Sequence, residues 1–199
     1  MSNFRSIWNH EFKQADEIAK RLLENKKVNI DWKIILLPVF LYTLYNYRKD
    51  LRFTRKNFLL TKQLAFDAAK NISQGKEQAW EFRKIEIKTQ EILDREKKGF
   101  YNEKIRRKQL SEIQLLIKHY LDLFESSQSK YVSIIKERYP AKGNYIAFLN
   151  TLHKAEEDVI QAAITTMRKG TKKDRRAWFQ KVKQTTRDIR MAEAEQIYQ

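Results

Sequence analysis

The chain has 199 residues, of which 42% are hydrophobic and 33% charged, and its 41 Lys and Arg against 25 Asp and Glu give a formal net charge of +16. This apolar content is enough to bury a core, so we expect a folded chain and not overall disorder. The absence of Cys excludes disulfides, thiolate nucleophiles, iron–sulfur clusters and Cys-containing zinc sites. The positive charge indicates a polyanionic partner: nucleic acid, an anionic membrane surface or an acidic protein.

The first residues, MSNFRSIWNHEF, mix apolar and charged side chains. They contain neither the apolar stretch nor the small-residue cleavage site of a secretory signal. We therefore expect a cytoplasmic protein that is not secreted, located at the inner face of a membrane if its anionic partner is lipid.

Gly occurs four times and Pro twice, and apolar residues recur three and four positions apart through most of the chain. This pattern predicts an all-α protein: an elongated helical bundle of about six helices with coiled-coil-like packing and no sheet. Residues 1–139 are predicted to form a helical body that includes the apolar segment 34–47. Residues 140–199 are predicted to form a C-terminal basic helical hairpin packed on the same body.

The first predicted helix ends near Asn25 and has one apolar stripe. Glu11 and Lys13 are predicted to lie on its polar faces. The predicted stripe consists of Phe4, Ile7, Trp8, Phe12, Ala15, Ile18, Ala19 and Leu22.

The next segment, residues 34–47, reads IILLPVFLYTLYNY and carries no charge. As a helix it would be about 21 Å long, short of the roughly 30 Å of a bilayer's hydrocarbon core, and Pro38 should kink it. Three interpretations stay open: a buried core helix, an interfacial or re-entrant membrane anchor, and a true span. Burial in a homo-oligomer interface would give the same pattern.

Five cations directly follow this apolar segment. Such an arrangement is typical of an anchor that enters the membrane interface, where each Lys or Arg contributes about 1 kcal/mol against anionic head groups. The predicted membrane or partner contact comprises Trp32, Leu37, Pro38, Phe40, Leu41, Tyr45, Arg48, Lys49, Arg52, Arg55 and Lys56.

Three further helical stretches follow before the next strong break. One runs to Ser73 with a stripe through Leu64 and Ala68, and one runs from Lys76 to Gly99 with Ile85 and Thr89 inward. From Asn102, a predicted cap, an apolar register continues to Ile135 and predicts one long helix or two nearly collinear pieces.

Pro140 and Gly143 predict a turn, after which a helix should run to Gly170. Thr171 and Asp174 have the spacing of a capping box at the start of the last helix. The predicted inward seam of that helix is Trp178, Val182, Thr185, Ile189, Ala192 and Gln196.

Ten Lys and Arg against two Asp lie between residues 168 and 190. With Trp178 and Phe179 among them, these cations could hold a nucleic-acid backbone while an aromatic ring stacks on a base. Alternatively, Trp178 is buried and the cations are a solvated face. The predicted polyanion-binding residues are Arg168, Lys169, Lys172, Lys173, Arg175, Arg176, Lys181, Lys183 and Arg187.

Motifs for catalysis or cofactor binding are absent. The residues three positions before His10, His119 and His153 are not Glu, which excludes a paired Glu-x-x-His di-iron site. His153 and Glu157 share a helix face, but one such pair is more typical of a surface hydrogen bond than of a metal site. No phosphate-binding loop is present. We therefore predict no catalytic residues, no metal, no cofactor and no small-molecule substrate, with an enzyme site assembled from dispersed residues as the weakest alternative.

These features predict a non-enzymatic helical interaction or scaffold protein, peripherally associated with an anionic membrane surface through segment 32–56. The alternative is a basic nucleic-acid-binding helical protein that uses segment 168–190. Either protein could be a homo-oligomer.

Overall fold

A computed structural model describes residues 3–24, 47–96, 101–166 and 171–199. These ranges contain seven helices: α1 (Asn3–Glu24), α2 (Tyr47–Ser73), α3 (Gln78–Arg95), α4 (Glu103–Phe124), α5 (Tyr131–Arg138), α6 (Lys142–Thr166) and α7 (Lys172–Tyr198). They contain no strand. The prediction of an all-α bundle is therefore confirmed, with seven helices in place of about six.

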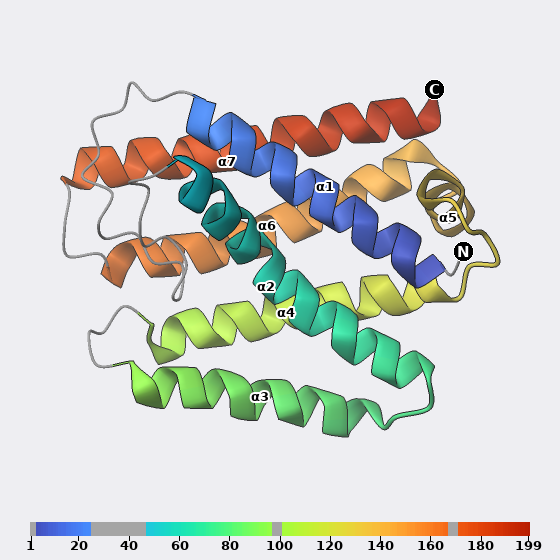
Figure 1. The fold of residues 1–199 in the computed structure, drawn as a ribbon, viewed down its shortest axis with the longest axis horizontal. Coiled ribbons are helices and arrows are strands. Elements are labelled where there is room, and N and C mark those ends of the chain that lie inside the picture. Colours follow the sequence, from blue (N-terminus) through green and yellow to red (C-terminus); the bar gives the residue numbers. More distant parts are fainter. Residues whose placement is uncertain (1–2, 25–46, 97–100, 167–170) are drawn as a thin grey trace.

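Helix α4 is the central helix of the bundle (Figure 1) and packs against α2, α3, α5 and α6. Buried side chains occupy a broad part of its circumference, among them Ile113, Leu116, Tyr120 and Leu123. Helices α1 and α7 contact each other, and α1 also packs on α2.

One hydrophobic core joins the two predicted parts of the chain. Its main cluster combines Ile7 of α1, Leu64 of α2 and Ile117 of α4 with Leu149 of α6 and Ile197 of α7. Residues 140–199 therefore share a core with the helices that precede them.

Local sequence signals set several helix boundaries. The Asn102 side chain accepts a hydrogen bond from the Ile105 amide at 3.0 Å. Thr171 and Asp174 form both halves of the predicted capping box. Between α2 and α3, Gly75 has a φ of +91°, which favours glycine because it has no Cβ.

The prediction that α4 and α5 are collinear is wrong. In Figure 1, α5 is seen nearly end-on while α4 lies across the view. The linker has its own polar contacts: Asn3 donates to the Phe124 carbonyl at 2.9 Å, and the Ser126 hydroxyl donates to Glu137 at 2.8 Å. These contacts provide hydrogen-bond partners for polar groups at the C-terminal end of α4, where the helix stops. Because they involve polar groups, the apolar pattern of the sequence does not indicate the bend.

Two predicted faces also need correction. On α1, Glu11 is 7% exposed and so belongs to the core, whereas Phe12 is 40% exposed. On α7, the buried seam contains Trp178, Val182 and Ile189 as predicted, but Thr186, Ala194 and Ile197 are buried in place of the predicted Thr185, Ala192 and Gln196. The predicted positions on α7 follow a heptad spacing, which drifts against the 3.6-residue turn of a straight helix.

Candidate functional site

The two basic segments of the chain begin in the same half of the bundle, on either side of the end of α1. Along the long axis of the molecule, α2 and α7 both begin at the left side of Figure 1, where α1 also ends. Near this end, the Lys181 ammonium of α7 donates to the Leu22 carbonyl of α1 at 2.8 Å. We call this region the basic end, defined by residues 48–56 of α2 and 172–176 of α7.

Part of the predicted membrane contact lies outside the described residues, namely Trp32, Leu37, Pro38, Phe40, Leu41 and Tyr45. The cations that follow, Arg48, Lys49, Arg52, Arg55 and Lys56, all lie in the first three turns of α2. Among the helices of the described ranges, none has an apolar stretch long enough to cross a membrane.

Arg55 has a structural role between α1 and α2. Its guanidinium lies 2.8 Å from the Asp16 carboxylate and 4.3 Å from the centre of the Phe12 ring. Hydrogen bonds from Lys20 and Arg55 hold the pKa of Asp16 below its ordinary value. The cation also covers the exposed Phe12 ring, which explains why this side chain is tolerated outside the core.

The cations predicted on the last helix divide into exposed and paired groups. Arg168 and Lys169 lie outside the described residues, and Lys172 is the first residue of α7. Lys173, Arg176 and Arg187 are exposed, whereas Arg175 is half-buried. The three exposed residues lie on one side of the helix, because positions 173, 176 and 187 fall within about 60° of one another at 100° per residue.

Lys181 and Lys183 are engaged with neighbouring helices. Burial lowers the pKa of Lys181, which binds the α1 carbonyl described above. Lys183 lies 2.7 Å from Glu157 of α6, which also lies 3.1 Å from His153. Trp178 is 5% exposed, so of its two interpretations the buried one is correct and the ring is not available to stack on a base.

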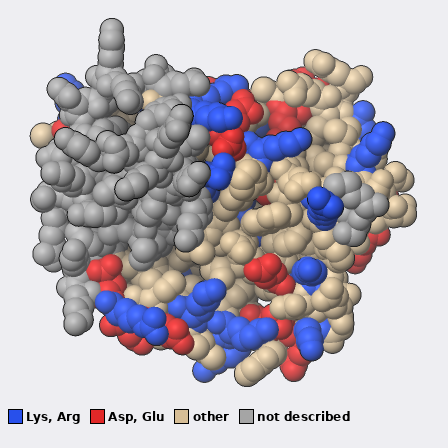
Figure 2. Space-filling model, viewed as in Figure 1, with Lys and Arg blue, Asp and Glu red and all other residues tan. Residues whose placement is uncertain are grey.

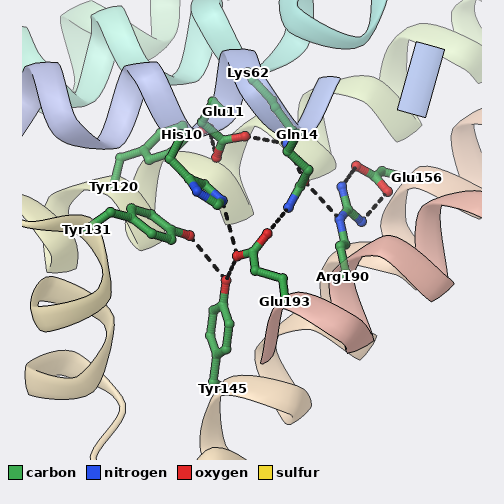
Figure 3. A network of polar contacts seen from close by, with 10 residues as sticks. All are labelled: His10, Glu11, Gln14, Lys62, Tyr120, Tyr131, Tyr145, Glu156, Arg190 and Glu193. Carbon is green, nitrogen blue, oxygen red and sulfur yellow. Dashed lines mark hydrogen bonds and ion pairs between the residues drawn. The ribbon is translucent and has the colours of Figure 1, made fainter. Parts of the chain in front are cut away.

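A second candidate site is buried in the bundle and was missed from the sequence. Figure 3 shows a network of polar side chains that reach one another from α1, α2, α4, α5, α6 and α7. Arg190 forms a two-pronged ion pair with Glu156, with both N···O distances 2.6 Å. Burial disfavours the charged guanidinium, but Glu156 more than compensates and raises the pKa of Arg190.

Glu11 and Lys62 form the second ion pair of this network, and the side chain of each is at most 10% exposed. The Tyr120 hydroxyl donates to the other Glu11 oxygen at 2.8 Å. Burial acts to raise the pKa of Glu11, but the Lys62 ammonium and His10 outweigh it and lower the value to about 2. Glu11 therefore carries its negative charge at neutral pH in the folded protein.

Gln14 links the two ion pairs to a third carboxylate. Its carbonyl oxygen lies 3.3 Å from both Lys62 and Arg190, and its amide donates to Glu193 at 2.8 Å. The other Glu193 oxygen lies 3.1 Å from His10 and accepts from Tyr145, also at 3.1 Å. Burial raises the pKa of Glu193, but these bonds lower it overall.

Glu112 of α4 is the fourth carboxyl near this network and is 6% exposed. Within the described ranges, it has no hydrogen bond or ion pair. Burial and the nearby Glu156 raise its pKa to about 8. The cations Lys62 and Arg190 of this network face four carboxyls, those of Glu11, Glu156, Glu193 and Glu112, so the geometry favours a neutral Glu112.

The chemistry that this network supports is ion pairing and proton binding. Its charged groups are buried and satisfy one another across helices, as expected of structural ion pairs. Across the described part of the chain, no group of three or more His, Asp or Glu residues could hold a metal ion. Glu11 and Arg190 are polar residues whose helix neighbours one turn before and one turn after are buried. A polar residue at such a position is the sequence signal that could have revealed the network.

Comparisons of this chain with family models, with curated proteins and with solved structures gave no match.

Proposed function

We propose that this protein is a helical interaction protein that binds an anionic membrane surface through its basic end, without catalysis. The observation that supports the proposal is that α2 and α7 both begin in this half of the molecule, so the basic residues after Tyr47 and those after Thr171 enter their helices at the same end of the bundle (Figure 1). Clustered cations attract anionic head groups more strongly than the same charges spread over a surface.

The uncharged segment 34–47 adds an apolar component to this charged surface. Its last residue, Tyr47, is the first residue of α2, so the segment is covalently attached to the basic end. An anchor of this kind inserts apolar side chains while the adjoining cations contact head groups.

Co-sedimentation with lipid vesicles tests the proposal. We expect binding to vesicles with about one third anionic lipid, little binding to neutral vesicles, and partial release at high salt because screening weakens only the charged component. Charge reversal of Arg175→Glu with Arg176→Glu should weaken binding severalfold, and Phe40→Ser with Leu41→Ser should abolish the salt-resistant fraction.

Lys118→Glu with Lys130→Glu is the matched control, because it changes the net charge equally but lies in the second half of α4 and just before α5, at the other end of the molecule from the basic end (Figure 1). It should leave vesicle binding nearly unchanged. Wild-type protein that ignores anionic vesicles at low salt would refute the membrane proposal.

A second candidate function is nucleic-acid binding along α7, favoured by the exposed Lys173, Arg176 and Arg187 on one side of the helix. With Trp178 buried, binding would rest on phosphate contacts and would be sequence-independent. Arg176→Glu should then reduce the slope of log affinity against log salt by about 1 for duplex DNA. Absence of binding to single- or double-stranded DNA and RNA at low salt would exclude this function.

A further inference from the structure

Helices α1 and α2 pack against each other, and an exposed aromatic ring lies where they meet. Phe12 of α1 is 40% exposed, and the Arg55 guanidinium of α2 lies 4.3 Å from the centre of its ring. Arg55 belongs to the basic end, so Phe12 borders that region. An exposed Phe beside cations is a side chain that can enter the head-group region of a membrane.

The side of α1 that carries Phe12 is mostly basic. Three charged residues lie on this side of the helix, namely Arg5, Asp16 and Lys20. Each is within about 80° of Phe12 around the helix axis, at 100° per residue. In Figure 2, Lys and Arg lie next to Asp and Glu to the right of the grey residues, where Figure 1 shows α1 crossing the front of the bundle. With Arg55 of α2, three cations and one carboxylate therefore accompany the ring.

Asp16 holds two of these three cations. Its Oδ1 lies 2.8 Å from the Arg55 guanidinium, and its Oδ2 lies 2.8 Å from the Lys20 ammonium. Both oxygens are therefore occupied by cations that would otherwise be available to an anion from outside. The carboxylate also repels an approaching lipid phosphate, so Asp16 competes with an anionic membrane for the same two partners.

The Arg55–Asp16 pair is accessible enough to be exchanged. Its side chains are 26% and 21% exposed, whereas those of Lys62 and Glu11 in the buried network are 6% and 10% exposed. Opening a pair that water already reaches leaves no buried charge without a partner, and such a pair contributes little to stability. Arg55 can therefore leave Asp16 for another anion, which Lys62 cannot do with Glu11.

We propose that Arg55 exchanges the Asp16 carboxylate for a lipid phosphate when the basic end meets an anionic membrane, and that Phe12 then enters the interface. This inference rests on the proposed function and extends the membrane contact from α2 onto α1. A guanidinium binds phosphate through two parallel hydrogen bonds, which favours the exchange. Asp16 thus acts as an internal competitor that lowers the affinity for the membrane.

The carboxylate is tested by comparing two variants of α1. Asp16→Asn should tighten binding to vesicles with one third anionic lipid by about threefold to tenfold, because it releases cations that each favour such a surface. Glu17→Gln is the matched control: it changes the net charge equally, but Glu17 pairs with Arg21 at 2.6 Å and not with Arg55. It should change the affinity by less than about twofold. In an Arg55→Gln background, the gain from Asp16→Asn should also fall below about twofold.

The ring is tested with a fluorescent probe, because the chain has no Cys and accepts a single label. A polarity-sensitive dye on Phe12→Cys should shift its emission to the blue with anionic vesicles. Neutral vesicles should give no shift, and neither should inorganic phosphate, which can pair with Arg55 but offers no apolar phase. The same dye on Val132→Cys is the control, at a position of similar exposure on α5 at the other end of the molecule (Figure 1), and should not respond.

The outcomes separate this inference from the proposed function. If wild-type protein binds anionic vesicles but the dye at position 12 does not respond, or Asp16→Asn binds no tighter than Glu17→Gln, the exchange is refuted and the membrane function stands. A dye that shifts equally with inorganic phosphate would also overturn it, since a lipid surface is then not required. Wild-type protein that ignores anionic vesicles would refute both. Circular dichroism checks that each variant folds, and the dye test needs no change at Asp16.

Discussion

Glu112 illustrates how one side chain makes the stability of the bundle depend on pH. Its carboxyl lies near Glu156 and Arg190, but Arg190 is already paired with Glu156. The folded protein therefore holds a proton on Glu112 that the unfolded chain releases near its ordinary pKa of 4.5. A carboxyl with a raised pKa in the folded state gives full stability below the unfolded value and loses it as the pH rises through the folded value.

We therefore predict that Glu112→Gln is increasingly stabilising, relative to wild type, between pH 5 and 8. The difference in free energy of unfolding should grow by at most about 1.4 kcal/mol per pH unit and level off above pH 8, because Gln stays neutral. Urea denaturation at several pH values measures this difference. Glu17→Gln, at an exposed carboxylate of α1, is the control and should show no such trend; a difference that does not change with pH would show that Glu112 is ionised in the fold.

At the scale of the element, α7 shows how a local signal can position a functional surface. The Thr171 side chain accepts from the Asp174 amide at 3.2 Å, and the Asp174 carboxylate accepts from the Thr171 amide at the same distance. This capping box sets the point at which the cations of residues 172–176 enter the helix. The start of α7 is therefore determined within four residues, while its buried seam depends on the helices around it.

Replacing Thr171 with Ala should remove the cap and lower the free energy of unfolding by about 1 kcal/mol, because helical N–H groups lose their acceptor. Thermal or urea denaturation measures the loss. Thr171→Ser is the matched control, since it keeps the hydroxyl, and it should remain within a few tenths of a kcal/mol of wild type. Equal losses for Ala and Ser would show that the cap contributes nothing.

At the scale of the whole molecule, buried ion pairs join helices that are distant in sequence. Lys62 of α2 binds Glu11 of α1, and Arg190 of α7 binds Glu156 of α6 and Gln14 of α1. Because Gln14 links the two pairs, the network as a whole is complete only when α1, α2, α6 and α7 pack together. The network therefore favours one helix arrangement over others that would bury similar apolar area.

Removing one member of the Arg190–Glu156 pair should therefore lower the free energy of unfolding much more than removing both members. Arg190→Met should lower the free energy of unfolding by about 3–5 kcal/mol, because Glu156 stays partly buried without its cation. The double variant Arg190→Met with Glu156→Leu should recover most of this loss, since apolar side chains can replace a buried pair. A double-mutant cycle by urea denaturation gives both values, and an Arg190→Met protein as stable as wild type would contradict the structural role of the pair.

Several properties of this protein were determined by its sequence alone. Scarce Gly and Pro with a helical apolar period predicted the all-α class, and Pro140, Asn102 and the Thr171 capping box predicted three boundaries, because each signal acts within a few residues. The two basic segments were also visible from composition. Membrane contact through residues 32–56 stays a prediction.

Only the tertiary structure decided which charged residues are buried and which surfaces lie together. Glu11 and Lys62 are 51 positions apart, and Gln14 and Arg190 are 176 apart, so no local pattern pairs them. A charged residue can enter a core only when another helix supplies its partner, and that depends on packing. Packing likewise brought the starts of α2 and α7 to one end of the bundle, and left the outer face of α3 uncovered.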